Sequence, residues 1–172
     1  MTTSEQAVAT DSPKVRTGIV VCSDRARSGE YVDKSGPAAA TWLNAQGYES
    51  CGITVIADDA KALERAVREF AETCPLIVVS GGTGIGERDI TPQTLDKFCD
   101  YEIPGVGEVL RAESLKLTPN AWLSRCSAWM LGRRLVLALP GNPKAVVEQL
   151  DILGQMLPKA MRSINGTCDH RK

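Results

Sequence analysis

The sequence has little of what common catalytic centres need. Its 172 residues contain a single histidine, His170 near the C-terminus, so a histidine-centred triad or metal cluster is not expected. No apolar run reaches the about 18 residues that a membrane-spanning helix needs. The formal net charge is −1, so no overall basic field favours nucleic acid or a membrane surface. Any anionic ligand must therefore be held by local groups.

Cysteines are present without the spacing of a metal or redox motif. The six are Cys22, Cys51, Cys74, Cys99, Cys126 and Cys168. No two of them form a C-x-x-C pair, and most lie inside apolar runs. This pattern favours buried, reduced thiols in a cytoplasmic protein over a disulfide framework or a zinc site.

Length and composition predict one domain with two short tails. A hydrophobic fraction of 43% is enough for a core at this length. The first fifteen residues are polar and small and lack the apolar segment of a signal peptide. We expect a disordered tail over residues 1–15, a single α/β domain over 16–165 and a C-terminal tail over 166–172.

Short apolar runs alternate with helical patterns along the chain. We expect strands over 17–22, 49–56 and 76–80, and a hairpin of two strands over 126–131 and 134–139. Helices are expected over 37–46, 60–73, 92–100, 105–117 and 143–164. Strands that alternate with helices predict a mostly parallel sheet with helices on both faces.

The starts of four helices carry residues that favour caps. Ser35 before Pro37 and Thr91 before Pro92 are expected to cap their helices, as is Asn142 before Pro143. Either Asp58 or Asp59 is expected to cap the helix from residue 60.

Three polar, glycine-containing segments each follow a predicted strand: residues 23–36, 81–91 and 140–144. Ligands of open α/β sheets bind outside the carboxyl ends of the strands. We therefore expect these three segments to converge at one edge of the sheet.

The second segment, within LIVVSGGTGIGERDITP at residues 76–92, resembles a phosphate-binding turn but matches neither common nucleotide motif. Glu87 and Arg88 replace the Lys and hydroxyl residue of a P-loop, and Glu87 stands where a dinucleotide-binding loop has its third glycine. Glycine backbone N–H groups still suit an anion. Asp89 beside such an anion suggests Mg²⁺; it could equally be a partner of the following helix dipole.

The third segment, PGNPK at residues 140–144, places Lys144 in the first turn of a helix. A cation there opposes the helix dipole, and an incoming anion would resolve the conflict, so we favour a binding role over a solvated surface lysine.

Arg25 and Arg88 could bind phosphate, or could simply pair with the neighbouring Asp24 and Asp89. Ser124 is expected to satisfy backbone groups, and Trp42, Trp122 and Trp129 to be core or interface aromatics.

Together, VVCSDRARSGEYVDKSGP, VVSGGTGIGERDITP, EIPGVGEVLR and LALPGNPKAV resemble the MoaB/Mog family of molybdenum cofactor biosynthesis over roughly four fifths of the chain. The Ser-Asp-Arg and Arg-Asp-x-Thr-Pro motifs favour its Mog-type branch. The resemblance implies a three-layer α/β/α sandwich, a homotrimer, and Mg²⁺-dependent transfer of AMP from ATP to the terminal phosphate of molybdopterin, with the product passed to a molybdenum-insertion protein.

The resemblance also implies which residues act. The essential acids and metal ligands are Asp58 and Asp89, with the choice between Asp58 and Asp59 open. The expected substrate-binding residues are Ser23, Asp24, Arg25, Gly81, Gly82, Thr83, Gly84, Arg88, Pro140, Gly141, Asn142 and Lys144.

Three alternatives are weighed against this function. The first is a MoaB-like protein that binds pterin or nucleotide without transfer, which Asp89 disfavours. The second is a molybdenum-insertion enzyme, disfavoured because those proteins carry a related domain within a much longer chain. The third is an α/β protein whose glycine loops merely connect elements, and such a protein would bind neither substrate.

Overall fold

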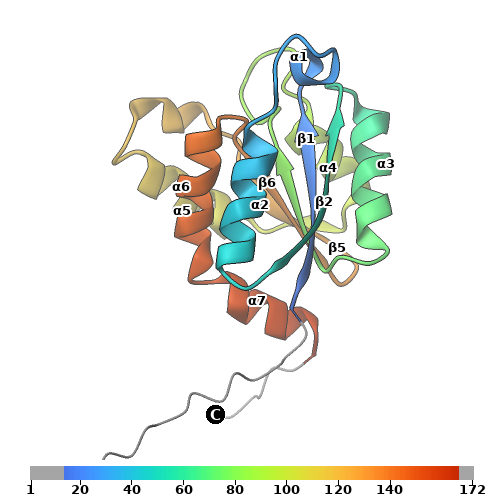
Figure 1. Cartoon of the computed structure of the whole chain (residues 1–172). Helices are drawn as coiled ribbons and strands as arrows, with labels where there is room; N and C mark the ends of the chain where they lie inside the picture. The colour runs from blue at the N-terminus through green and yellow to red at the C-terminus, as the bar shows by residue number, and fades with distance from the viewer. Residues whose placement is uncertain (1–13, 167–172) are drawn as a thin grey trace, which may run out of the picture.

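The alternating apolar runs form a six-stranded sheet in the computed structural model, which describes residues 14–166 (Figure 1). The strands are β1 (Arg16–Cys22), β2 (Glu49–Ile56), β3 (Leu76–Ser80), β4 (Tyr101–Glu102), β5 (Ser127–Leu131) and β6 (Arg134–Leu139), in the order β2-β1-β3-β6-β5-β4. The first four strands in that order pair in parallel, and β5 is antiparallel to both of its neighbours. The predicted parallel sheet with an antiparallel hairpin is confirmed.

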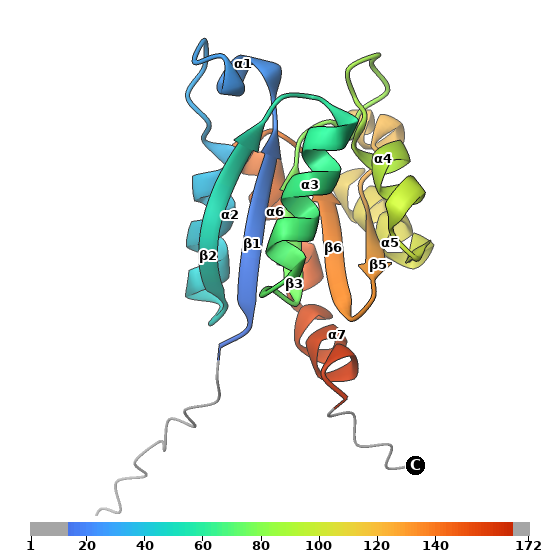
Figure 2. The same ribbon diagram turned by 90° about the vertical axis from the view of Figure 1, so that its right-hand side faces the viewer.

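Helices cover both faces of the sheet. They are α1 (Asp24–Arg27), α2 (Ser35–Ala45), α3 (Ala60–Ala71), α4 (Thr91–Phe98), α5 (Pro104–Ser114), the 3-10 helix η1 (Pro119–Leu123), α6 (Pro143–Gly154) and α7 (Leu157–Ile164). Figure 2 shows α3 and α4 in front of the sheet and α2 and α6 behind it. The three-layer α/β/α architecture is therefore present.

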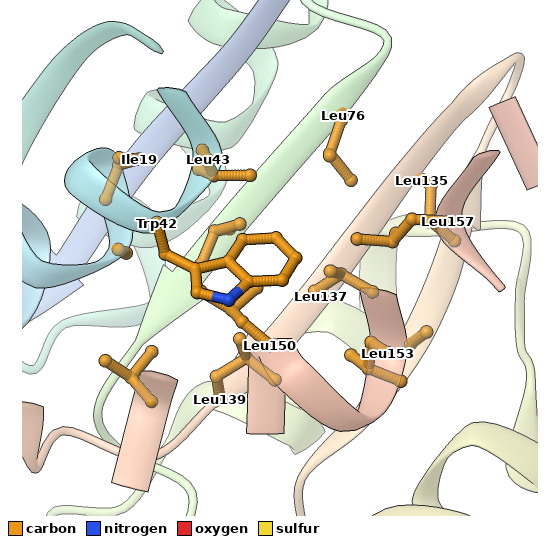
Figure 3. Packing of buried hydrophobic residues seen from close by; sticks show 14 of the residues in the cluster. Ile19, Trp42, Leu43, Leu76, Leu135, Leu137, Leu139, Leu150, Leu153 and Leu157 are labelled. Atoms are coloured by element: carbon orange, nitrogen blue, oxygen red, sulfur yellow. The ribbon is translucent and has the colours of Figure 1, made fainter. Parts of the chain in front are cut away.

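Alternation along the strands divides the core between these two faces. Ile19 and Val21 of β1 belong to the cluster under α2 and α6, whereas Val20 and Cys22 belong to the cluster under α3 and α4. Within the first cluster Trp42 lies among leucines of the sheet and of α6 (Figure 3), and its indole Nε1 donates to Asp151 at 2.6 Å. Consecutive residues of one strand thus anchor opposite helix layers.

The prediction that the tryptophans are core or interface aromatics is confirmed for two of them. Trp129 is 1% exposed and donates from Nε1 to Asp96 at 2.8 Å, so it belongs to the core with Trp42. Trp122, however, is 75% exposed, because the short helix η1 carries it away from the sheet.

Two of the four predicted caps are correct. The side chains of Asp59 and Asn142 accept from backbone N–H groups at the starts of α3 and α6. The prediction for Ser35 is wrong because Ser35 is the first residue of α2; the Asp33 carboxylate instead accepts from the backbone N–H of Ser35. The prediction for Thr91 is wrong by one residue, since α4 begins at Thr91 and the hydroxyl donates to the Gly81 carbonyl.

Several elements are shorter or more numerous than expected. The predicted loop 23–36 contains the short helix α1, and the two-residue strand β4 and η1 were not anticipated. The predicted helix 143–164 is divided into α6 and α7. The predicted domain limits stay a prediction, and the expected tails lie almost wholly outside residues 14–166.

The described cysteines are all free. Cys22, Cys74 and Cys126 are buried and Cys51 and Cys99 are partly buried, while Cys168 lies outside the described residues. Burial raises the pKa of the Cys22 thiol to about 12, so this thiol is protonated and unreactive at neutral pH. Within residues 14–166 no helix is long and apolar enough to cross a membrane.

Candidate functional site

The three polar segments converge as predicted at the carboxyl ends of β1, β3 and β6. There they line a cavity of about 410 Å³, to which the segment after β2 adds Asp58. Its lining includes the predicted residues Ser23, Gly81, Gly82, Thr83, Gly84, Arg88, Asp89, Pro140, Gly141 and Asn142. In the sheet, β2 lies on one side of β1 and β3 lies on the other, so the strand order reverses there. Such a reversal leaves a crevice at the carboxyl ends of the strands.

The turn after β3 requires glycine. Gly81 and Gly82 have φ of 100° and 65°, in the left-handed region that side chains disfavour. A Cβ at Gly81 would lie 2.3 Å from the carbonyl oxygen of Cys22. We call residues 81–91 the glycine loop; its close approach to β1 explains why its sequence is punctuated by glycine.

Asp89 folds back over the glycine loop. Its Oδ2 accepts from the backbone N–H of Gly86 at 2.8 Å, and a Cβ at Gly84 would lie 2.7 Å from the same oxygen. The carboxylate does not cap α4, whose N-cap is Ile90. Asp89 lines the cavity, and its role as a magnesium ligand stays a prediction.

Asp58, which lines this cavity, is hydrogen-bonded to Asp24. The backbone N–H of Asp24 donates to Oδ2 of Asp58 at 3.1 Å, and the backbone N–H of Asp58 donates to Oδ1 of Asp24 at 2.9 Å. Burial, the largest effect, raises the pKa of Asp58, and the charges of Asp24 and Asp89 act in the same direction. Asp59 instead caps α3, so the geometry favours Asp58 as the acid of the site.

Arg88 pairs across the cavity mouth rather than with its neighbour in sequence. Its Nε donates to Oδ2 of Asp24 at 2.9 Å, and its Nη2 contacts the same oxygen. The bond from the Asp58 N–H and the pair with Arg88 lower the pKa of Asp24, which therefore stays ionised. The alternative in which Arg88 pairs with Asp89 is wrong, because its ion pair joins the glycine loop to α1 instead.

Three predicted binding residues lie outside the cavity lining. Arg25 pairs with Glu30 at 3.2 Å and stacks over the Tyr31 ring at 5.8 Å. The side chain of Lys144 is 86% exposed, with its Nζ 3.7 Å from Glu148. Both cations are thus held near the site by weak surface pairs that an anion could displace, and Asp24 acts through Asp58 and Arg88.

A second cavity, of about 420 Å³, lies on the other side of the glycine loop. It shares Thr83, Gly84, Asp89 and Pro140 with the first and is walled by apolar side chains of η1 and the segment before it, including Leu117 and Leu123. The glycine loop therefore separates a polar cavity from a more apolar one. Two ligands bound on its two sides would meet at Thr83, Gly84 and Asp89.

Arg125 and Ser124 adjoin the same loop. Arg125 was not among the predicted residues, yet its guanidinium donates to the Gly84 carbonyl at 2.6 Å and to the Asp89 carbonyl at 2.7 Å. Nothing in LSRC distinguishes it from a surface arginine. Ser124 behaves as expected, because its hydroxyl accepts from the Cys126 backbone N–H at 3.3 Å.

The acids of the site fit a magnesium ion that binds together with substrate phosphates. Among residues 14–166 no group of three or more His, Cys, Asp or Glu side chains could hold a metal alone. Asp58 and Asp89 nevertheless line one cavity. Mg²⁺ commonly uses one or two carboxylates and completes its shell with water and phosphate oxygens.

Comparison with known families decides the assignment of the fold. The model of the probable molybdopterin-binding domain matches residues 18–159, which includes every candidate residue of the site. The chain belongs to this molybdopterin-binding family. The family resemblance seen in the sequence motifs is thereby confirmed.

Relatives within the molybdopterin-binding family are similar over most of the chain. The molybdopterin adenylyltransferase of Helicobacter pylori is 35% identical over 88% of this chain and 89% of its own length. A molybdenum cofactor biosynthesis bifunctional protein of Synechococcus elongatus is also 35% identical, but the chain spans only 48% of that protein. The crystal structure of the molybdopterin biosynthesis enzyme MoaB from Thermus thermophilus superposes with a TM-score of 0.83 at 35% identity, covering 88% of this chain and 97% of that one.

Proposed function

We propose that this protein is a molybdopterin adenylyltransferase, which transfers AMP from ATP to the terminal phosphate of molybdopterin and releases pyrophosphate. The observation that carries the proposal is the pair of cavities on the two sides of the glycine loop. A transfer between two large substrates needs two adjoining sites with one shared wall. The name of the Helicobacter pylori relative supports the same reaction.

The proposed reaction exchanges one phosphoanhydride bond for another. An oxygen of the molybdopterin phosphate attacks the α-phosphorus of ATP, a new P–O bond forms, and the bond to the β-phosphate breaks to release pyrophosphate. Both substrates are polyanions, so bringing them together and neutralising their charge account for most of the rate enhancement. No protein nucleophile is required, in keeping with the buried, protonated Cys22 beside the site.

Three groups of candidate residues have a role in this scheme. Backbone N–H groups of the glycine loop would donate to the phosphates, and Arg88 would be available to them when they displace Asp24. Asp58 and Asp89 would hold Mg²⁺, which would neutralise charge on the reacting phosphates. The start of α6, with Gly141, Asn142 and Lys144, offers a second anion-binding group.

A binding protein without transferase activity is the second candidate. One observation bears on it: Arg88 is paired with Asp24, and an arginine that kept this pair after ligand binding would not reach the reacting phosphates. Such a protein would bind pterin tightly and form no product.

Assembly and location complete the proposal. We infer a homotrimer and transfer of the product to a molybdenum-insertion protein from the family resemblance. A cytoplasmic location is supported by the five described cysteines, which are free thiols as in reducing compartments.

The test is direct. Purified protein is mixed with molybdopterin, ATP and Mg²⁺, and adenylylated pterin and pyrophosphate are separated by chromatography. We expect both products, and no product when Mg²⁺ is chelated. Asp89→Asn should keep the fold and pterin binding but lose all except a residual rate of transfer, because the amide still accepts from Gly86 and no longer binds the cation. Tight pterin binding without product in the wild type would select the second candidate.

A further inference from the structure

The side chain of Arg125 joins the two ends of the turn that carries Asp89. Its Nε donates to the Gly84 carbonyl at 2.6 Å, and its Nη2 donates to the Asp89 carbonyl at 2.7 Å. The backbone N–H of Arg125 also donates to the Thr83 carbonyl at 2.9 Å. One residue from the segment before β5 therefore holds the glycine loop through both its main chain and its side chain.

A third contact closes this arrangement into a network. Nη1 of Arg125 donates to Oε1 of Gln93 at 2.7 Å, and Nε2 of Gln93 donates to the Asp89 carbonyl at 2.8 Å. The Asp89 carbonyl thus accepts from two side chains that are themselves bonded to each other. Such a network restricts the backbone of Asp89 more than either bond would alone.

The groups that accept from Arg125 indicate its structural role. They are two carbonyl oxygens and an amide oxygen, and within residues 14–166 Arg125 takes part in no ion pair. A planar guanidinium presents donors in several fixed directions, whereas the ammonium of lysine donates from a single atom. Lysine could not reach all three acceptors from one position.

We propose that Arg125 is a positioning residue for adenylyl transfer. It is not among the lining residues of either cavity; it fixes Gly84 and Asp89, which lie at the wall shared by the two cavities. This inference rests on the proposed function. Without the guanidinium, the Gly84 and Asp89 carbonyls accept hydrogen bonds from water, and the Asp89 carboxylate moves away from the Gly86 backbone N–H.

A double-mutant cycle with Asp89 tests the role. Displacement of a reacting group by about 1 Å costs on the order of 100-fold in rate, so Arg125→Lys should lower kcat by about that factor. When Asp89 is already replaced by Asn, Arg125→Lys should lower the residual turnover by less than about threefold, because the effects of substituting residues that act as a unit do not add. Multiplicative losses would overturn the proposal.

A matched control is available at the amino end of β6, the end of the strand opposite to the site. Arg134 also donates from Nε to a carbonyl, that of Ala71 at 2.7 Å, at a distance from both cavities. Arg134→Lys should leave kcat within about twofold of the wild type, as expected for a substitution remote from the site. An equal loss of kcat in both lysine variants would show a general structural effect and would overturn the assignment.

Hydrogen exchange decides the question independently of activity. Arg125→Lys should speed amide exchange roughly tenfold in peptides covering residues 84–89, with no change in β1 or β6. Gln93→Leu, which removes one arm of the network, should give a smaller increase in the same peptides if Arg125→Lys does not fold. Unchanged exchange would overturn the proposal. If wild-type protein forms no product, the proposed function fails instead, and exchange still shows whether Arg125 holds the loop.

Discussion

Asp24 and Asp58 bind each other reciprocally, the backbone N–H of each donating to the carboxylate of the other at 2.9 and 3.1 Å. Two like charges are thereby held together at the ends of neighbouring strands. Arg88 neutralises one of them, Asp24, by a direct ion pair. Asp58 makes no ion pair among residues 14–166, so no cationic side chain competes with a metal ion for its carboxylate.

Substitution of the adjacent acids separates their roles. Asp58→Asn should lower kcat for adenylyl transfer at least about 100-fold, on the scale typical for removal of an electrostatic group from a reaction centre. Asp59→Asn should stay within about twofold of the wild type, because asparagine caps a helix as well as aspartate does. Steady-state kinetics of the two purified variants measure the difference. The reverse ranking would assign the second acid to Asp59.

The raised pKa of Asp58 predicts that its removal stabilises the fold. Burial makes the ionised carboxylate less favourable in the folded protein than in the unfolded chain, so this residue lowers stability as pH rises through and above its unfolded pKa. Asp58→Asn should therefore raise Tm at pH 7 by roughly 1–3 °C. The gain should vanish below about pH 3, where the carboxyl is protonated in both states. Scanning calorimetry across pH measures it, and a lower Tm for the variant at pH 7 would contradict the argument.

Much of the fold follows from local patterns. The apolar runs at 49–56 and 76–80 became strands with the predicted limits, because β-branched residues in short runs have few alternatives. Asn142 caps α6 as predicted, since a cap depends only on residues that adjoin it. The convergence of the three loops also followed, because it depends on strand direction alone.

Contacts between distant segments could not be predicted in this way. The sequence suggested for Arg88 either phosphate binding or an ion pair with the adjacent Asp89, but it pairs with Asp24, 64 residues earlier. Arg125 reaches Gly84 across 41 residues and was not singled out at all. Both pairings depend on how the loops lie over the sheet, and one sequence carries no pattern for that.

Gly84 should be required because it leaves room for the Asp89 carboxylate, and not because of its own backbone conformation. Its φ is not in the left-handed region, so alanine is compatible with the chain, but its Cβ would lie 2.7 Å from Oδ2 of Asp89. Gly84→Ala should displace the carboxylate and lower kcat by about 100-fold, while the protein stays folded by circular dichroism.

Gly105 provides the matched control for that substitution. It lies in the first turn of α5, and a methyl group added there would meet no atom of residues 14–166 within 4 Å beyond its own turn of helix. Gly105→Ala should retain full turnover and gain up to about 1 kcal/mol of stability from helix propensity. Equal turnover of the two alanine variants would mean that turnover does not depend on the observed position of the Asp89 carboxylate.

Thr91 should stabilise the glycine loop through one buried hydrogen bond. Its hydroxyl is fully buried and donates to the Gly81 carbonyl at 2.8 Å, and no second donor to that carbonyl is found within residues 14–166. Thr91→Val keeps the shape of the side chain and leaves the carbonyl unsatisfied, so it should lower the free energy of unfolding, measured in urea, by about 1–3 kcal/mol.

Thr94→Val is the control. The Ile90 carbonyl that accepts from the Thr94 hydroxyl also accepts from the Thr94 backbone N–H, so the loss of unfolding free energy should stay below about 1 kcal/mol. Equal losses would show that the cost comes from removing a buried hydroxyl as such, and not from the orphaned carbonyl at the start of the loop.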